Sequence, residues 1–214
     1  MKVAIDIDNT IVDYRKLIIH YLANNQYEFQ NKFQLRSDFS INFIKNSIKS
    51  SLGDNVWQQI QSIIYSYNEK ISFYEHVEIA FEEIGKLGHE IYLVSHKSTF
   101  GIGDSKKINI RQIAACRIYD WIYKNKFKKY ISGVIFCETF EDKLACLIDI
   151  KPNVIIDDLL KIHTEYRNIS KEKSVHNILF DGATVLNEKV IIENKKIHLK
   201  KNWISIIEFF SELN

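Results

Sequence analysis

The sequence predicts an α/β protein with a doubly wound parallel sheet, in which a small group of helices is inserted after the first strand. Short apolar runs alternate with amphipathic helical patterns along most of the chain, which is typical of parallel sheets built from strand–helix–strand units. Polar side chains gather at the carboxyl ends of several of these runs. Between about residues 14 and 72 the alternation stops, and one helical pattern follows another.

Five short apolar runs are predicted to be buried strands, because each is rich in β-branched or aromatic residues. They are Val3–Ile7, Glu90–Val94, Gly133–Cys137, Asn153–Ile156 and Asn177–Phe180. Apolar residues at helical spacing predict helices between and after the later strands. These are Val77–Leu87, Ile108–Asn125, Glu138–Ile150 and Ile204–Leu213. Ligands of such sheets bind at the carboxyl ends of the strands, so the polar residues found there are the candidates for function.

The inserted segment is predicted to be helical throughout, since "RKLIIHYLANN", "SDFSINFIKNSIKS" and "GDNVWQQIQSIIYSYNEK" each show helical apolar spacing. We therefore expect residues 1–13 and 73–214 to form the α/β core, and residues 14–72 to form a small helical cap over the strand ends. The aromatic side chains of the cap are expected to pack mainly into its own core. They are Tyr27, Phe29, Phe33, Phe39, Phe43, Trp57, Tyr65 and Tyr67.

Composition narrows the class of protein. The chain has 214 residues, 46% of them hydrophobic, which suffices for one domain with a modest insertion. It has 29 Lys and Arg against 27 Asp and Glu, and a net charge of +2 gives no reason to expect a nucleic-acid or membrane-surface partner. The three cysteines have apolar neighbours and no metal-binding spacing, so we expect reduced core thiols. No run is apolar enough for a signal peptide or a membrane span, and we expect a cytoplasmic protein.

Side chains suited to phosphoryl chemistry stand at four of the predicted strand ends and helix starts. "DIDNT" gives Asp6, Asp8 and Thr10, and a period of two places both aspartates on the same side of an extended backbone. Each residue alone has an ordinary explanation as a helix cap, a turn residue or a surface lysine. The other residues suited to phosphoryl chemistry at these strand ends and helix starts are Ser95, His96, Lys143, Asp157 and Asp158.

The four aspartates in this set repel one another unless a cation lies between them, and ligands that are all oxygen suit Mg²⁺. A hydroxyl and a lysine at the same edge supply the hydrogen bond and the positive charge that a phosphoryl group needs. One carboxylate can attack phosphorus, because aspartate forms acyl phosphates. A second carboxylate two residues further on can protonate the leaving oxygen and then activate water.

The motifs "DIDNT", "VSHKS", Lys143 and "IIDDLL" resemble, in order, the four motifs of the haloacid dehalogenase (HAD) superfamily of phosphohydrolases. The resemblance extends from residue 6 to 158. It implies a Rossmann-like core, Mg²⁺ as cofactor, and an insertion at the position of the family's C1 cap. It also implies that Asp6 is the nucleophile and that Asp8 is the general acid/base, whose backbone carbonyl binds Mg²⁺ as well.

The remaining roles also follow from the resemblance. Ser95 would hold the transferring phosphoryl group, and Lys143 would steady that group and the nucleophile. Thr10 and His96 complete the expected phosphate-binding set. The expected metal ligands are Asp6, Asp8, Asp157 and Asp158, with Asp158 favoured over Asp157 as the direct ligand.

Two positions depart from the family pattern or compete for a role. Asn9 stands where many members carry Gly, so the turn after Asp8 must tolerate a side chain, and Asn can do this. Lys151 competes with Lys143 for the third motif, but it directly precedes a predicted strand and so lies at the wrong end of that strand. We therefore assign the role to Lys143.

The sequence thus predicts a Mg²⁺-dependent phosphomonoester hydrolase that acts on a small-molecule phosphate ester such as a nucleoside 5′-monophosphate. A polynucleotide-end or sugar phosphatase of the same superfamily, a phosphomutase and a non-catalytic binding module stay open as alternatives. Neither a membrane nor a nucleic acid is expected as a partner, and a homo-oligomer stays open. The segment after Ser95 is equally consistent with a surface loop and with a loop near the site. In the second case the candidates for recognising the leaving group are His96, Lys97 and Arg111.

Overall fold

A computed structural model of the protein contains a six-stranded sheet in which every neighbouring pair of strands is parallel. The structure describes residues 1–24, 36–66, 71–101, 108–172, 174–182 and 197–213. The strand order is β5-β4-β1-β6-β7-β8. The strands are β1 (Lys2–Ile5), β4 (Glu90–His96), β5 (Ile131–Cys137), β6 (Val154–Asp157), β7 (His176–Phe180) and β8 (Ile197–Lys200). The predicted fold class is confirmed.

All five predicted strands are present, and each end lies within two residues of the prediction. β1 lies in the centre of the sheet, where Ile5 is opposite Leu93 of β4 on one side and Ile156 of β6 on the other. The carboxyl ends of β1, β4 and β6 therefore meet at one edge. The sixth strand, β8, was not predicted, because its sequence "IHLK" carries only two apolar residues.

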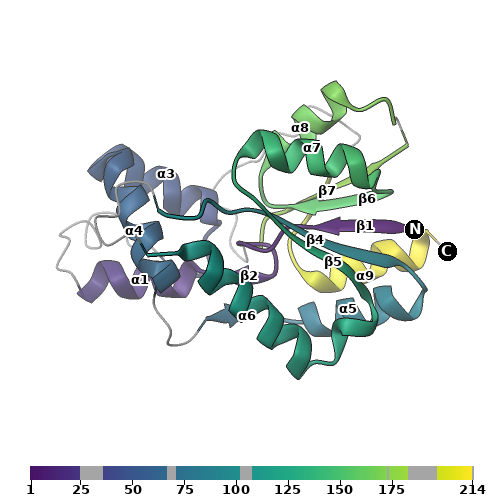
Figure 1. Ribbon diagram of the computed structural model, residues 1–214. Helices are drawn as coiled ribbons and strands as arrows, with labels where there is room; N and C mark the ends of the chain where they lie inside the picture. The colour runs from purple at the N-terminus through teal and green to yellow at the C-terminus, as the bar shows by residue number, and fades with distance from the viewer. Residues whose placement is uncertain (25–35, 67–70, 102–107, 173, 183–196, 214) are drawn as a thin grey trace.

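Helices cover both faces of the sheet (Figure 1). On one face lie α5 (Val77–Lys86), α6 (Ile110–Lys124) and α9 (Trp203–Glu212), and on the other lie α7 (Phe140–Ile150) and α8 (Leu160–Ile169). Successive residues of β1 point to opposite faces, so Val3 and Ile5 join the α5–α6–α9 core while Ala4 joins the α7–α8 core. A short 3₁₀ helix (Phe127–Lys129) precedes β5.

A second group of helices lies beside the sheet, next to the carboxyl ends of its strands (Figure 1). It consists of α1 (Arg15–Asn24), α3 (Ile41–Leu52) and α4 (Asp54–Ser66), which we call the inserted helices. At their base, β2 (Val12–Asp13) pairs antiparallel with β3 (Ser72–Phe73). This pair was not predicted, since two residues are too few to form a pattern. The aromatic residues Tyr27, Phe29, Phe33 and Tyr67 lie outside the described residues.

Arg15 links the inserted helices to the sheet. Its side chain is buried and makes two 2.8 Å hydrogen bonds to the carboxylate of Asp13. It also donates to the backbone carbonyls of Phe39, at 3.2 Å, and Gly182, at 2.6 Å. The guanidinium lies over the ring of Tyr74, 4.9 Å from its centroid. One side chain therefore joins residues from α1, from the segment before α3 and from the segment after β7.

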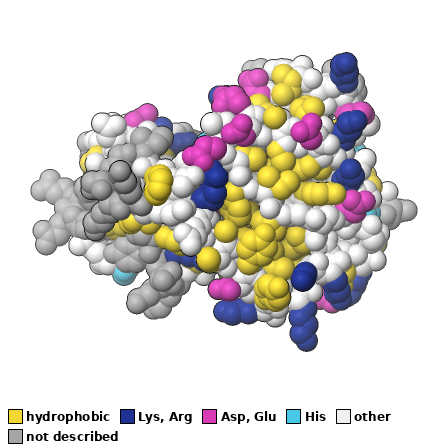
Figure 2. Space-filling model, viewed as in Figure 1, with side chains coloured by type: hydrophobic (Ala, Val, Ile, Leu, Met, Phe, Trp, Pro, Cys, Tyr) yellow, Lys and Arg dark blue, Asp and Glu magenta, His cyan; other side chains and the backbone are white. Residues whose placement is uncertain are grey.

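Among the described residues, none of the helices is both long and apolar enough to cross a membrane. Figure 2 shows basic and acidic side chains interspersed over the face of the molecule seen in Figure 1. All three cysteines are free thiols. The prediction that all three are core residues was wrong for Cys116, which is exposed on α6, whereas Cys137 is buried and Cys146 partly buried.

Candidate active site

The chain turns sharply after β1, and the turn presents two aspartates. Asp6 is buried and its backbone N–H still bonds to Ile156 in β6, at 2.9 Å. Asn9 has a φ of +59°, in the left-handed region, and its N–H donates to the carbonyl of Val12 at 2.8 Å. Asn is among the few residues that adopt this conformation at low cost. The expectation that Asn9 can replace Gly in this turn is confirmed.

Lys143 reaches the turn from the first full turn of α7. Its ammonium group donates to Asp6 Oδ1 at 2.6 Å and lies 2.7 Å from Asp157 Oδ2, and its side chain is only 2% exposed. Burial disfavours the charged ammonium, but the attraction of Asp157 and Asp6 outweighs this and raises the pKa of Lys143. Lys151 instead ends α7 on an exposed turn. The structure therefore brings Lys143, and not Lys151, to the strand ends.

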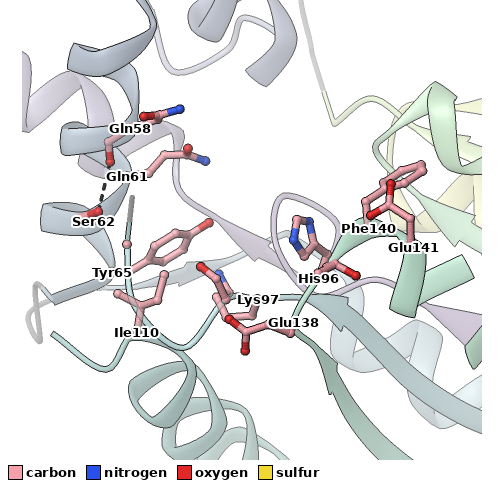
Figure 3. A pocket seen from close by; sticks show the side chains of 13 residues that line it. Gln58, Gln61, Ser62, Tyr65, His96, Lys97, Ile110, Glu138, Phe140 and Glu141 are labelled. Carbon is pink, nitrogen blue, oxygen red and sulfur yellow. Dashed lines mark hydrogen bonds between the residues drawn. The ribbon is translucent and has the colours of Figure 1, made fainter. Parts of the chain in front are cut away.

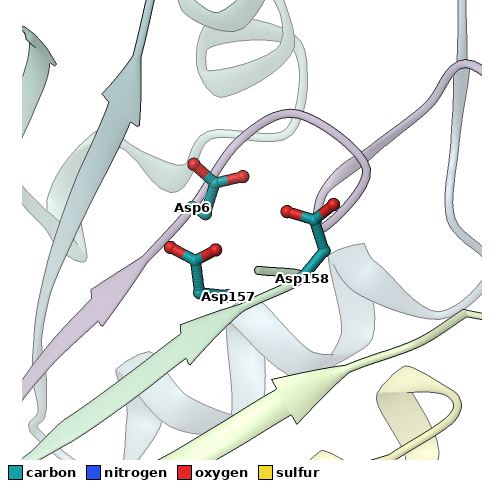
Figure 4. Close-up of side chains that lie close together, drawn as sticks. All are labelled: Asp6, Asp157 and Asp158. Atoms are coloured by element: carbon teal, nitrogen blue, oxygen red, sulfur yellow. The ribbon is translucent and has the colours of Figure 1, made fainter. Parts of the chain in front are cut away.

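Asp6, Asp157 and Asp158 form an acidic cluster, in which one oxygen from each carboxylate lies within 4.8 Å of the others (Figure 4). Asp157 also accepts a hydrogen bond from the Leu159 N–H at 2.9 Å, so both of its oxygens have protein partners. Asp158 has no hydrogen-bond or ion-pair partner within the described part of the chain. Of the three carboxylates in the acidic cluster, that of Asp158 is therefore the one whose two oxygens both have free lone pairs among the described residues.

Charge in the cluster is unbalanced, because Lys143 is the one lysine in contact with the three carboxylates among the described residues. Burial raises the pKa of Asp6 to about 7, and repulsion from Asp157 and Asp8 adds to this while Lys143 opposes it. Burial, together with repulsion from Asp6 and Asp157, also raises the pKa of Asp158. A bound cation would relieve this repulsion, and a donor set made only of oxygen suits Mg²⁺.

Asp8 points away from this cluster and toward the inserted helices. Its carboxylate forms an ion pair with Lys97 and accepts a 3.3 Å hydrogen bond from the Tyr65 hydroxyl of α4. The Lys97 ammonium is buried and lies 3.3 Å from the centroid of the Tyr65 ring. Burial lowers the pKa of Lys97, although the attraction of Asp8 opposes this. Asp8 is expected to bind Mg²⁺ through its backbone carbonyl, and its carboxylate lies outside the cluster of the other three.

The other predicted phosphate-binding residues are placed differently from one another. Ser95, at the end of β4, is 1% exposed, and its hydroxyl has no hydrogen-bond partner among the described residues. Thr10 is completely buried and donates to Asp6 Oδ2 at 3.4 Å, so its hydroxyl contacts the carboxylate predicted to be the nucleophile. His96 is exposed, and burial of part of its ring lowers its pKa.

Two adjoining cavities lie between the strand ends and the inserted helices. The inner chamber, of about 210 Å³, is lined by Asp6, Asp8, Lys143 and Asp158 from the sheet side and by Lys45 among others from the inserted helices. The outer chamber, of about 450 Å³, is lined by the residues drawn in Figure 3. Three residues line both chambers and so mark their junction: Gln61, Tyr65 and His96.

Sequence reasoning missed several residues of this site, among them Tyr65 and Lys45. Tyr65 was assigned to the core of the insertion, but it also contacts Asp8 and Lys97. Lys45 was not considered, and it lines the inner chamber from α3. The spacing of Gln58, Gln61 and Tyr65 along α4 could have shown that one face of this helix mixes polar and aromatic groups.

The candidates in the segment after Ser95 divide between the site and its surroundings. Lys97 lies in the site, beside Asp8. Arg111 instead donates to the Lys97 carbonyl at 2.9 Å and forms an ion pair with Glu138. Its guanidinium therefore supports the loop from outside the chambers.

Comparison with known proteins identifies the fold. No family model matches the sequence, and no curated protein matches it. Among solved structures, a HAD-superfamily hydrolase from Ehrlichia chaffeensis is 15% identical with a TM-score of 0.52, over 99% of this chain and 96% of that one. The HAD-hydrolase YfnB from Bacillus subtilis, bound to magnesium, is 9% identical with a TM-score of 0.51, over 97% of both chains.

A third similar structure is a mutant of CbbY from Rhodobacter sphaeroides in complex with xylulose-(1,5)bisphosphate. It is 8% identical with a TM-score of 0.51, over 94% of both chains. These likenesses extend over nearly the whole length of each chain. The protein therefore has the fold of the HAD superfamily of hydrolases and phosphatases.

Proposed function

We propose that the protein is a Mg²⁺-dependent phosphomonoester hydrolase that works through a phosphorylated Asp6. The observation that carries the proposal is the buried contact of Lys143 with both Asp6 and Asp157 at the ends of two neighbouring strands. The fold that the protein shares with HAD hydrolases and phosphatases supports the same reaction class.

In this proposal the Asp6 carboxylate attacks phosphorus, and the bond from phosphorus to the ester oxygen breaks. Lys143 orients the nucleophile through its 2.6 Å contact, and Thr10 restrains the second oxygen of the same carboxylate. The unpartnered hydroxyl of Ser95 donates to the transferring phosphoryl group. These contacts hold the nucleophile in one orientation before substrate arrives, which lowers the cost of reaching the transition state.

Asp8 supplies the proton steps. It gives a proton to the leaving oxygen, and then takes one from the water that attacks the aspartyl phosphate, so that phosphate and free Asp6 are released. Lys97 and Tyr65 fix its position from the side away from the acidic cluster. The separation of the Asp8 carboxylate from Asp158 and Asp157 supports different roles for the two aspartates of "DIDNT".

The residues of the acidic cluster fit a magnesium ion. Asp6, Asp158 and the backbone carbonyl of Asp8 would hold it, with Asp157 behind them, and the free carboxylate of Asp158 favours this residue as a direct ligand. Bound Mg²⁺ would neutralise the repulsion between the anionic nucleophile and an anionic substrate. We propose that residues 14–72 serve as a cap that shields the reaction from water, and that a small organic phosphate such as a nucleoside 5′-monophosphate is the substrate.

Hydrolysis of p-nitrophenyl phosphate tests the proposal directly. We expect activity with Mg²⁺ that is lost with a chelator and with Asp6→Asn. After acid quenching, wild-type protein mixed with radiolabelled p-nitrophenyl phosphate should carry an alkali-labile label. Asp8→Asn should accumulate this label, because p-nitrophenolate leaves without a proton whereas hydrolysis of the aspartyl phosphate needs the base. Asp149→Asn, an exposed change on α7 away from the cluster, serves as the control. Equal activity of wild type and Asp6→Asn would contradict the mechanism.

A further inference from the structure

The outer chamber is lined mostly by different residues from the inner one. These residues bear on which leaving group the substrate can carry. This chamber has a volume of about 450 Å³, which falls within the range of about 300–1,000 Å³ that is typical of small-molecule sites. It opens into the inner chamber past Gln61, Tyr65 and His96. A phosphate ester whose phosphoryl group occupies the inner chamber would therefore place its leaving group in the outer one.

Among the described residues that line the outer chamber, the charge without a partner is negative. Lys97 is the one lysine or arginine among its described lining residues, and its ammonium is already committed to Asp8 and to the face of the Tyr65 ring. Glu138 is neutralised by Arg111 and accepts from the N–H and hydroxyl of Thr99, at 3.0 and 2.9 Å. Glu141 is exposed in the first turn of α7 and has no ion-pair partner in the described part of the chain. An anionic leaving group would thus meet an uncompensated carboxylate.

The chamber also offers unused hydrogen-bonding groups. The side-chain amides of Gln58 and Gln61 project from α4 toward the cavity and make no hydrogen bond to the rest of the described chain (Figure 3). Each amide can donate and accept, which matches hydroxyl groups in either sense. Tyr65, Ile110 and Phe140 add apolar surface to the lining of the same chamber. Such a mixture suits a carbon chain or ring that carries many hydroxyls.

We infer that the leaving group of the substrate is uncharged and polyhydroxylated, as in a sugar, a polyol or the ribose of a nucleoside, and that Gln58 and Glu141 select for it. This inference rests on the proposed phosphohydrolase function, because it assumes that the phosphoryl group occupies the inner chamber. Gln58 contributes by binding hydroxyls. Glu141, on the opposite side of the chamber (Figure 3), contributes by repelling an acidic leaving group.

Pairs of ligands that differ in one carboxylate test the proposed selection against acidic leaving groups. Glycerol phosphate and phosphoglycerate, each with the phosphate on a terminal carbon, differ only in one CH₂OH that becomes a carboxylate. Sorbitol phosphate and phosphogluconate differ in the same way with six carbons. Calorimetric titration of the Mg²⁺-loaded Asp6→Asn variant gives the affinity for each ligand without turnover.

We expect the hydroxylated member of each pair to bind about tenfold more tightly than its carboxylate counterpart. Glu141→Gln should narrow this ratio, whereas Asp149→Asn, which removes an exposed carboxylate elsewhere on α7, should leave it unchanged. Gln58→Leu should weaken the hydroxylated ligands about fivefold, whereas Gln59→Leu, which changes an exposed neighbour outside the chamber, should not.

Equal affinities, tighter binding of the carboxylates, or no binding of the hydroxylated ligands at millimolar concentration would overturn the inference. Wild-type hydrolysis of p-nitrophenyl phosphate, whose leaving group has no hydroxyl groups, reports separately on the proposed function. Hydrolysis of p-nitrophenyl phosphate together with no preference between the paired ligands would reject the inference alone. No hydrolysis of p-nitrophenyl phosphate would reject the proposed function.

Discussion

Buried lysines neutralise the carboxylates of the candidate site, and among the described residues Lys143 is the buried lysine with two carboxylate partners. Lys143→Met keeps the length of the side chain but leaves Asp6 and Asp157 without their cation. Removing one partner from a buried ion pair costs about 3–5 kcal/mol of folding free energy. We expect a loss of that size in urea unfolding of the metal-free protein, together with loss of hydrolysis.

Lys151→Met is the matched control for this prediction, because Lys151 ends the same helix on an exposed turn. We expect its unfolding midpoint to stay close to that of the wild type. A Lys143→Met protein as stable as Lys151→Met would show that the buried contacts of Lys143 contribute little.

In the proposed mechanism Lys97 is a positioning residue, because its ion pair with Asp8 would fix the group that moves the protons. Lys97→Met should slow phosphorylation of Asp6 by an alkyl phosphate about 10²-fold, the lower limit of what a general acid contributes. Phosphorylation by p-nitrophenyl phosphate should slow much less, since p-nitrophenolate leaves without a proton. Rapid-quench measurement of the labelled protein separates the two substrates.

Tyr65→Phe gives the comparison for Lys97→Met. It removes the hydroxyl that bonds to Asp8 but keeps the ring that covers the ammonium, so we expect a smaller effect of the same kind. An equal loss with both classes of ester would mean that Lys97 acts on something other than the proton transfer.

At the scale of elements, the join between the inserted helices and the sheet depends on Arg15. Arg15→Met leaves the buried carboxylate of Asp13 unpaired and removes two hydrogen bonds to backbone carbonyls. We expect destabilisation of about 3–5 kcal/mol by urea unfolding, partly recovered in Arg15→Met with Asp13→Asn. Lys16→Met, at the exposed neighbouring position, should have little effect. No recovery in the double variant would contradict the role given to the pair.

The elements that could be predicted from sequence are the ones with a long enough pattern. The apolar runs of β1, β4, β5, β6 and β7 and the amphipathic spacing of α5, α6, α7 and α9 were visible in the sequence. The strands β2, β3 and β8 were missed, because two to four residues with few apolar side chains carry no reliable period. The helix α8 was also missed, because its sequence "LKIHTEYRNI" is mostly polar. The role of Tyr65 could not be predicted, since its contact with Asp8 joins positions 57 residues apart.

At the scale of the whole molecule, binding of Mg²⁺ should stabilise the folded state over the unfolded state. A ligand at one hundred times its dissociation constant contributes about 2.7 kcal/mol. We expect millimolar Mg²⁺ to raise the thermal midpoint by several degrees, and Asp158→Asn to abolish most of that rise. Asp149→Asn should keep it. A rise of the same size in Asp158→Asn would show that the ion binds elsewhere or without this carboxylate.

The central position of β1 has a consequence for how the chain folds. This strand precedes the other strands of the sheet, and its two neighbours lie about 90 and 150 positions later in the sequence. The contact between Lys143 and Asp6 likewise spans 137 positions. Pairings of such long range form slowly, because a large loop must close before any contact is gained. During synthesis β1 therefore stays unpaired until β4 and β6 have been made, and the acidic cluster can assemble only once the chain has been made as far as Asp158.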